Sequence, residues 1–568
     1  MTMQRKTVRG VLVFAALLTC LGSPLDAAEA PLKVDPAVLE AQAARVAVID
    51  KVAPSVVAIF GPDGGGGGSG VLISADGYAV TNFHVTDGCG DAMKCGLNDG
   101  RIYDAVIVGT DPVGDVALIK LLGRDDFPVA EFGDSDLVRP GDWCLALGNP
   151  FLLAKSDFAP TVTYGLVSGT HRYQEPAGTF LEYTDCLQID ASVNPGNSGG
   201  PLFAADGPQA GRLIGINGRI SIKRGRVNSG AAYAISSNQV KYFLGHLRSG
   251  RALDHGTLNA TVRTNFDGDV LFDRVLDGSA AQVRGIKEGD ELVAFAGRPI
   301  RSVNQFKNVL GVYPAGWPLP LTVRRGTETL DFLVRTRGLN RRTDLLQTVA
   351  PKPGPPPNDV VKPLLEKRPG YANAHFNDVE RDRVLASLGD DLSAGPWRIT
   401  GTDVDGVSAE FTLADGGVGL KLGANRFLQS LEPDADVADE PPSTGGLLFA
   451  LRQWQLLRSG QTEAFADLHY VGTEPLDWDG PTVDVLAAEN RGMTTHFYVA
   501  VGADGKGFLR GFDSWQDNRG AAVEVRFDEE RLTGPLPIPS RLRVFAAGQP
   551  YRNFEFTAAT VADSGDAE

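Results

Sequence analysis

The most constraining feature of this sequence is the stretch 190–202, which places Ser198 in a tight, glycine-flanked turn that leads into an apolar strand. Glycine adopts backbone dihedrals that other residues avoid, so a substrate can approach such a turn closely. A serine hydroxyl is a weak nucleophile unless a base lies within hydrogen-bond reach and a third group orients that base. The turn therefore predicts a nucleophilic serine whose partners come from elsewhere in the chain.

Two residues upstream have the right chemistry and context. His84 follows the apolar strand 78–82, and Asp115 directly precedes the apolar strand 116–120. Taken alone, such a histidine is more often structural and such an aspartate is more often a turn former. The chain order His, Asp, Ser along a run of short strands is the order of chymotrypsin-type double barrels. The three residues together therefore predict a catalytic triad.

Composition limits the classes of partner. The chain has 568 residues and a formal net charge of -16, which argues against nucleic acid or an anionic membrane surface as the main partner. Its 68 glycines suit short strands joined by turns. Its length predicts about three to four domains.

Residues 1–30 have the features of a secretory signal peptide. Arg5, Lys6 and Arg9 form a basic segment, an apolar run covers 11–21, and small residues follow. The run is shorter than the roughly 20 residues that cross a bilayer. We therefore expect export to the periplasm or cell envelope, or secretion, with no stable transmembrane segment once the signal is removed.

The cysteines predict little ligand chemistry. Cys89 and Cys95 lie in one Gly- and Asp-containing loop, so a local disulfide is expected in an oxidising compartment. Cys144 and Cys186 fall in separate apolar strands, where a bridge and buried thiols remain alternatives. No histidine lies at ligand spacing from a cysteine. We expect neither a metal nor a cofactor.

Six blocks of the sequence resemble the HtrA (Deg) family of trypsin-like proteases: 81–85, 111–120, 148–151, 162–168, 196–202 and 232–238. The resemblance implies two packed β-barrels, placed here at 31–250, and endoprotease activity on unfolded or extended polypeptides of the cell envelope. It also implies a homotrimer. The glycine loop at 64–68 is short where some family members have a long assembly loop, which argues against a cage-like oligomer. The alternative function is a chaperone-like or ligand-binding envelope scaffold with minor proteolytic turnover.

Each residue of the predicted site has a role. Ser198 attacks the peptide carbonyl, His84 accepts its proton, and Asp115 orients the imidazole. The amides of Gly196 and Ser198, with Asn197 between them, are predicted to form the oxyanion hole. Asn197 carries no charge to pair with a newly cut N-terminus, so activation by propeptide cleavage is not expected.

A second set of residues predicts specificity. Ser192 stands six residues before the nucleophile, where trypsin carries the acid that selects Lys and Arg. With Val193 and Ile216 as pocket neighbours, this neutral hydroxyl predicts cleavage after small or medium apolar residues. The alternative for Val193 and Ile216 is that they pack the second barrel.

Residues 251–338 resemble a PDZ domain of the bacterial protease type. Such a domain binds an extended peptide as an added strand and captures its carboxylate on backbone amides. The matching segment includes Leu258, Asn259 and Ala260. The family prefers glycine at the position of Asn259, which weakens carboxylate capture here. A purely structural or oligomer-gating role is the alternative.

Two further regions complete the predicted organisation. A Pro-rich linker covers 339–365, and an α+β domain with a predominantly antiparallel sheet and no assigned role covers 366–560. The last domain resembles sheet-and-helix lipoprotein-carrier folds.

Helices are expected at 36–52, 303–313, 371–388 and 447–457, and a hairpin with an Asp-Gly turn at 69–82. The predicted fold class is mainly β, with a chymotrypsin-like double β-barrel, a PDZ domain and this α+β domain.

Overall fold

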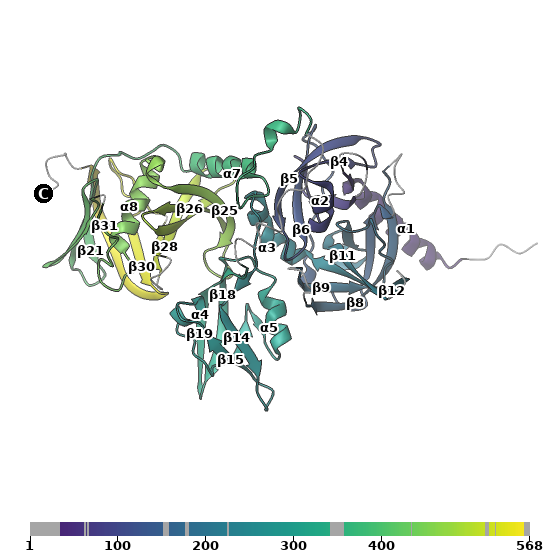
Figure 1. The fold of residues 1–568 in the computed structure, drawn as a ribbon, viewed down its shortest axis with the longest axis horizontal. Coiled ribbons are helices and arrows are strands. Elements are labelled where there is room, and N and C mark those ends of the chain that lie inside the picture. The colour runs from purple at the N-terminus through teal and green to yellow at the C-terminus, as the bar shows by residue number, and fades with distance from the viewer. Residues whose placement is uncertain are drawn as a thin grey trace, which may run out of the picture. The chain divides into compact units, whose positions relative to one another are not determined.

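The computed structural model describes residues 34–561 apart from 62–63, 65–66, 151–157, 176–180, 224–226, 341–356, 433, 517–521 and 529 (Figure 1). The predicted signal peptide and most of the Pro-rich linker lie outside the described residues. The chain divides after Ala47 into two units, and helix α1 (Pro36–Val52) spans the division. Within the described ranges, no helix has both the length and the apolar character needed to cross a membrane.

The first barrel is a closed sheet with strand order β1-β2-β3-β6-β5-β4. Its side chains pack an interior that includes Val57, Ile59 and Ile119. Its strands are β1 (Val56–Phe60), β2 (Gly68–Leu72), β3 (Tyr78–Thr81), β4 (Ala92–Gly96), β5 (Ile102–Asp111) and β6 (Val116–Leu121), and helix α2 (Phe83–Cys89) follows β3. The predicted hairpin is present as β2 and β3, with Gly77 of its turn at φ 99°.

The second barrel is also closed, with strand order β10-β11-β12-β9-β8-β7. Its strands are β7 (Trp143–Gly148), β8 (Thr161–Gln174), β9 (Tyr183–Ile189), β10 (Pro201–Ala204), β11 (Leu213–Lys223) and β12 (Val227–Ser236). Helix α3 (Ser237–Arg248) continues from β12, and the Ser236 hydroxyl caps it by accepting from the Gln239 N–H. Two closed barrels in succession confirm the double-barrel prediction.

The next segment forms an antiparallel sheet with β14 at one edge. Its elements are β13 (Gly256–Thr257), β14 (Ala260–Thr264), β15 (Val270–Val275), α4 (Ala280–Val283), β16 (Glu291–Phe295), β17 (Arg298–Pro299), α5 (Val303–Leu310), β18 (Pro318–Arg325), β19 (Glu328–Arg335) and β20 (Arg337–Gly338). Helix α5 packs beside β14 and β16. The helix expected at 303–313 is present as α5, which ends at Leu310.

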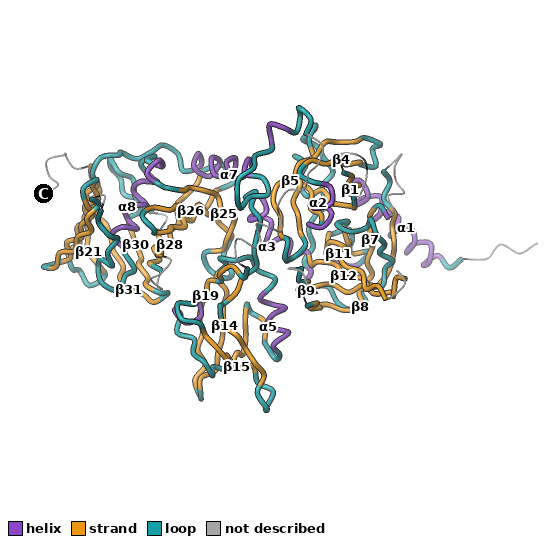
Figure 2. The backbone as a smooth tube through the Cα atoms, viewed as in Figure 1, coloured by secondary structure: helices purple, strands orange, loops and turns teal. Residues whose placement is uncertain are grey.

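The C-terminal region is built on one eleven-stranded antiparallel sheet, as Figure 2 shows in orange. Its strands are β21 (Trp397–Asp403), β22 (Ser408–Ala414), β23 (Gly417–Leu422), β24 (Asn425–Ser430), β25 (Asp467–Pro475), β26 (Thr482–Asn490), β27 (Met493–Val501), β28 (Gly507–Gln516), β29 (Val523–Phe527), β30 (Arg541–Ala546) and β31 (Gln549–Val561). Helices α7 (Ala374–Ser387) and α8 (Leu447–Arg458) confirm both expected helices, and every residue of α8 is buried. The antiparallel α+β prediction is confirmed.

Short 3-10 helices connect these elements: η1 (Ala53–Ser55), η2 (Ser135–Leu137), η4 (Gly207–Gln209), η5 (Lys362–Leu364) and η6 (Thr462–Ala464).

The cysteines require a correction. Cys89 and Cys95 are buried thiols in one apolar cluster and are not joined by the predicted disulfide. Burial raises the pKa of the Cys95 thiol, because a thiolate loses its hydration there. Cys144 and Cys186 are also buried thiols, which agrees with the packing alternative for that pair.

The core of the C-terminal sheet makes a stability prediction. Trp397 is fully buried, and its ring contacts Trp454 edge-on with 5.4 Å between centroids. The variant Trp397→Ala removes this contact and leaves a cavity, so we expect a loss of about 3–5 kcal/mol in the free energy of unfolding of this region. Urea denaturation followed by circular dichroism measures the loss. The matched control is Leu428→Ala, because Leu428 is 71% exposed. Equal effects of both variants would contradict the assignment of the core.

Candidate active site

His84 and Asp115 form a direct hydrogen-bonded pair. His84 lies in the first turn of α2, and its Nδ1 is 3.0 Å from Oδ1 and 2.9 Å from Oδ2 of Asp115. The Asp115 carboxylate is buried, whereas the His84 side chain is 47% exposed. Burial lowers the pKa of His84, but the hydrogen bond and charge of Asp115 outweigh it and raise this pKa above its usual value. His84 is therefore a stronger base than a free imidazole, on a side chain that is partly open to solvent.

The Asp115 carboxylate is fixed from several sides. It accepts a hydrogen bond from the His84 backbone N–H at 3.0 Å, and the Tyr183 hydroxyl donates to its Oδ2. Its backbone carbonyl accepts from Asn82 Nδ2 at 2.9 Å. Asp115 itself has φ 59°, a left-handed conformation that is costly for a residue with a side chain. The surrounding bonds hold both the side chain and this unusual backbone in place.

Ser198 lies in the turn between β9 and β10, beside the segment that carries His84. Its carbonyl accepts a hydrogen bond from the Ser69 N–H at 2.8 Å. A Cβ placed on Gly68 would come within 2.7 Å of Val85 Cγ2 and 2.8 Å of the Ser198 oxygen. Gly68 thus allows Ser198 and the residue after His84 to approach one another. The structure brings the two predicted residues into one neighbourhood.

The Ser198 hydroxyl forms no hydrogen bond with His84 within the described ranges. Such bonds are often long in enzymes without substrate and tighten when substrate binds. Gly199 has φ 82°, and a Cβ there would come within 2.2 Å of both the Ser69 carbonyl oxygen and Thr81 Oγ1. The glycine after the serine is therefore required by close packing against the first barrel.

The turn before Ser198 exposes backbone donors. Gly196 has φ 103°, and its carbonyl accepts from the Ser69 hydroxyl at 2.7 Å. The same hydroxyl accepts from the Asn149 N–H at 2.8 Å. Among the residues that the structure describes, the amides of Gly196 and Ser198 have no hydrogen-bond acceptor, whereas the Asn197 N–H bonds to the Asn194 carbonyl at 2.9 Å. Two of the three predicted oxyanion-hole positions therefore have available amides, and the Asn197 amide is used by the turn.

The predicted pocket residues divide into two groups. Ser192 is exposed, and its carbonyl accepts from Thr163 Oγ1 at 2.9 Å. Val193 and Ile216 are only 1% and 0% exposed and belong to the apolar cores of the second barrel. Their burial favours the packing alternative, which leaves Ser192 as the accessible member of the set.

The predicted peptide-binding segment leads into the edge strand β14: Leu258 and Asn259 precede the strand, and Ala260 is its first residue. Leu258 is buried in the core of this sheet. Asn259 has φ 51°, a conformation that suits the glycine expected at this position. The Asn259 N–H is engaged by Thr257 Oγ1 at 3.1 Å. This hydrogen bond competes with the use of that amide for carboxylate capture.

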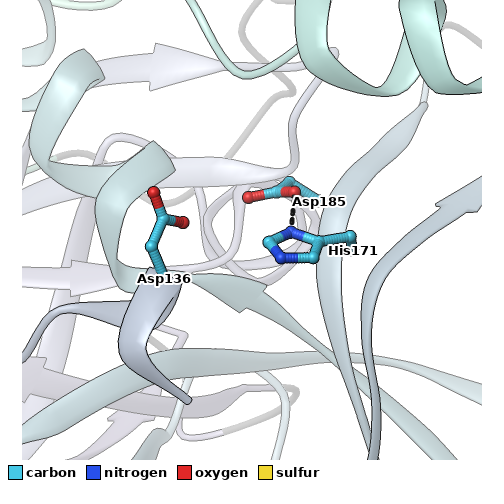
Figure 3. A group of neighbouring side chains, drawn as sticks. All are labelled: Asp136, His171 and Asp185. Atoms are coloured by element: carbon cyan, nitrogen blue, oxygen red, sulfur yellow. Dashed lines mark hydrogen bonds and ion pairs between the residues drawn. The ribbon is translucent and has the colours of Figure 1, made fainter. Parts of the chain in front are cut away.

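A second histidine–aspartate cluster joins the 3-10 helix η2 to strands β8 and β9 of the second barrel. The side chains of Asp136, His171 and Asp185 face one another, with donor atoms within 4.8 Å, as Figure 3 shows. His171 Nδ1 is 2.7 Å from Asp185 Oδ1. The Arg298 guanidinium donates to Asp185 at 2.7 Å and to Asp136 at 2.9 Å. Since Arg298 already supplies the cation for both carboxylates, we assign the cluster to an ion-paired contact rather than to a metal.

The sequence reasoning missed several residues that support the site. Tyr183 and Ser69 hold Asp115 and Gly196, but each comes from a distant strand and has no local signal. The only sequence signal for Asn82 is that it is a polar residue directly before a short helix, which does not predict its hydrogen bond to the Asp115 carbonyl. These roles depend on strand pairing within the barrels.

Comparisons with known proteins show what this chain is similar to. Residues 68–216 match the trypsin-like peptidase domain family. A probable periplasmic serine endoprotease DegP-like from Marinomonas sp. (strain MWYL1) is 38% identical over 255 residues, 43% of this chain and 51% of the relative. The periplasmic serine endoprotease DegP of Escherichia coli (strain K12) is 38% identical over 271 residues, 45% and 54% of the two chains. The chain thus spans about half the length of these curated relatives. A solved structure of the HtrA-type protease AlgW with a tripeptide has 29% identity and a TM-score of 0.42, and the match covers 52% of this chain and 96% of that one.

The His84–Asp115 pair predicts an elevated imidazole pKa. In the full chain with Ser198→Ala, which prevents self-digestion, we expect the His84 titration midpoint to lie above the usual 6.5. The variant Asp115→Asn removes the charge that raises the pKa, so burial then dominates and the midpoint falls. NMR titration of labelled histidine rings measures both values. A midpoint that Asp115→Asn leaves unchanged would contradict the pairing.

Proposed function

We propose that this chain, which carries a trypsin-like peptidase domain over residues 68–216, is an exported HtrA-type serine endopeptidase. Its substrates would be misfolded or specific polypeptides of the cell envelope. The observation that carries the proposal is the 2.9 Å bond between His84 Nδ1 and buried Asp115, with the Ser198 turn beside it. The relatives named as periplasmic serine endoproteases support both the activity and the location.

Catalysis follows from these three side chains. The Ser198 hydroxyl attacks the peptide carbonyl while His84 Nε2 takes its proton, and His84 then returns the proton to the leaving amine. Asp115 keeps the Nδ1 proton of His84 directed at its carboxylate and stabilises the imidazolium that forms. Water then cleaves the acyl-enzyme by the same steps, with His84 again acting as base and acid.

The developing oxyanion needs donors that are already in place. The available amides of Gly196 and Ser198 are suited to this role, and the bond from Ser69 to the Gly196 carbonyl fixes the orientation of that turn. Removing one such donor typically costs about 3–4 kcal/mol of transition-state stabilisation. This loop is held by the Ser69 hydroxyl and not by a charge at position 197, where the residue is Asn197. Such a loop fits a site that needs no propeptide cleavage.

Specificity is assigned to the neutral, exposed Ser192. The nearest acid in sequence, Asp190, accepts a hydrogen bond on its Oδ1 from the Leu166 N–H of β8 at 2.6 Å. A pocket without an acid to bind Lys or Arg favours small or medium apolar side chains before the cleaved bond.

Peptide binding is assigned to the sheet at 251–338. Its edge strand β14 has an open side next to helix α5, and an extended peptide can pair with such an edge. The solved HtrA-type proteases named with a tripeptide and a decapeptide fit this type of partner. The engaged Asn259 amide supports recognition through the strand more than through a terminal carboxylate. The homotrimer implied by the resemblance stays a prediction.

The nucleophile can be tested directly. We expect the full chain to cleave denatured casein and Ser198→Ala to lower this rate by about 10⁴-fold or more, because the base and orienting acid act only through the serine. Gel-based and fluorescent assays measure the rate, and circular dichroism checks that both proteins are folded. Binding of casein without cleavage by the wild type would instead support the scaffold alternative.

The pocket assignment predicts a specificity change. Mass-spectrometric mapping of cuts in a denatured protein mixture should find mainly small or medium apolar residues before the cleaved bond. In Ser192→Asp, the new carboxylate should raise the share of cuts after Lys and Arg at least about tenfold. Ser192→Ala is the matched control and should keep the apolar preference. Dominant cuts after Lys or Arg in the wild type would overturn the assignment.

A further inference from the structure

The chain segment that follows helix α3 is bound to the end of strand β5. The Thr110 N–H donates to the Arg251 carbonyl at 3.1 Å, and the Leu253 N–H donates to the Thr110 carbonyl at 2.8 Å. Thr110 and Ala252 thereby form a parallel bridge. Segment 251–255 lies outside the matched peptidase residues 68–216, yet it extends the first barrel at the strand that leads to Asp115.

His255 ends this segment in a fully enclosed position. Its side chain is 1% exposed, and its Nε2 lies 2.9 Å from Oδ2 of Asp111, which is 0% exposed. The Phe243 ring packs on it with 4.6 Å between ring centroids. The acidic groups that act on His255 are Asp111, Asp254 and Glu182. Burial lowers the pKa of His255, but these charges outweigh it and raise the pKa above its usual value.

Asp111 connects His255 to the turn that carries Asp115. While Oδ2 contacts His255, Oδ1 accepts hydrogen bonds from the N–H groups of Val113 at 3.1 Å and Gly114 at 2.9 Å. The carboxylate therefore closes the turn between β5 and β6. A buried carboxylate with two amide donors on one oxygen needs a partner for the other, and His255 is that partner.

The backbone at Gly114 is tightly packed against Asp111 and His255. A Cβ there would lie 2.4 Å from Asp111 Oδ2 and 2.9 Å from His255 Nε2, closer than atoms can approach without displacement. The next residue is Asp115 at φ 59°. A backbone in this conformation persists only when its surroundings over-determine it. Asp111 accepts a hydrogen bond from Gly114, the residue that immediately precedes the strained position, and His255 lies close beside Gly114.

We propose that His255 is a positioning residue for the active site: through Asp111 it fixes the turn that aims the Asp115 carboxylate at His84 Nδ1. The inference rests on the proposed peptidase function for its kinetic consequence. It also assigns a part of the catalytic architecture to a residue beyond the matched peptidase domain. The barrels alone would then hold all three triad residues but not the full set of contacts that orients them.

The simpler alternative is that the buried pair only stabilises the fold. A purely stabilising pair would change the free energy of unfolding and leave the folded active site unchanged. A positioning pair changes the geometry between Asp115 and His84 in the folded protein. The pKa of His84 reports that geometry, because the hydrogen bond and charge of Asp115 raise it and the charge of Asp87 adds to them.

The test compares His255→Leu with His255→Gln, which keeps an N–H donor for Asp111, in the full chain. We expect His255→Leu to lower kcat about 100-fold with KM little changed, because small misplacements of catalytic groups have effects of this size. His255→Gln should recover most of kcat. In the Ser198→Ala background, NMR should find a lower His84 midpoint in His255→Leu than in the parent. The control is His496→Gln, a buried histidine of the C-terminal sheet, which should leave kcat unchanged.

The outcomes separate the two proposals. If the wild type has no peptidase activity, the proposed function fails, and the His84 titration still decides the role of His255. An unchanged His84 midpoint in folded His255→Leu, or equal kcat in His255→Leu and wild type, would overturn the inference. If His255→Leu does not fold, Asp111→Asn replaces it, since it keeps the turn-closing oxygen and loses the charge next to His255. An unchanged His84 midpoint in that variant would likewise overturn the inference.

Discussion

A carboxylate removed from water is stable only when donors surround it, and the region around Asp115 is organised by this requirement. The backbone N–H and ring of His84 and the hydroxyl of Tyr183 donate to its oxygens, and they come from the two different barrels. The same contacts that compensate for burial also direct the imidazole. Stability and catalytic orientation therefore depend on one set of hydrogen bonds, and a change to either barrel at this point affects both.

Buried ion pairs also connect the later regions of the chain. Arg335 of β19 contacts Glu474 at 2.6 Å and Asp513 at 3.2 Å, both on strands of the C-terminal sheet. Burial raises the pKa of Asp513, but the charges of Arg526 and Arg335 outweigh it and lower this pKa to about 2. Breaking such a pair typically costs 3–5 kcal/mol, about as much as a core cavity, because the remaining charge stays buried without a partner.

Local patterns were sufficient for many elements. The periodicity at 36–52 and 447–457 predicted helices that are present as α1 and α8, and the Asp76-Gly77 turn predicted the hairpin of β2 and β3. Two expectations were less successful for physical reasons. The nearness of Cys89 and Cys95 in sequence predicted a disulfide, but both thiols point into apolar packing. The position of Val193 near the nucleophile predicted a pocket residue, but the loop between β9 and β10 packs its side chain into the apolar core of the second barrel.

The sequence by itself determined the chemical types at the site and their order along the chain: an imidazole after one strand, a carboxylate before another, and a hydroxyl in a glycine turn. These features could be predicted because turns and strands have local sequence signals, and each of the three residues lies next to such a signal. Only the tertiary structure decided which side chains support them, including Tyr183, Ser69 and His255. These contacts join residues that are far apart in sequence and that strand pairing brings together, so no local sequence pattern predicts them.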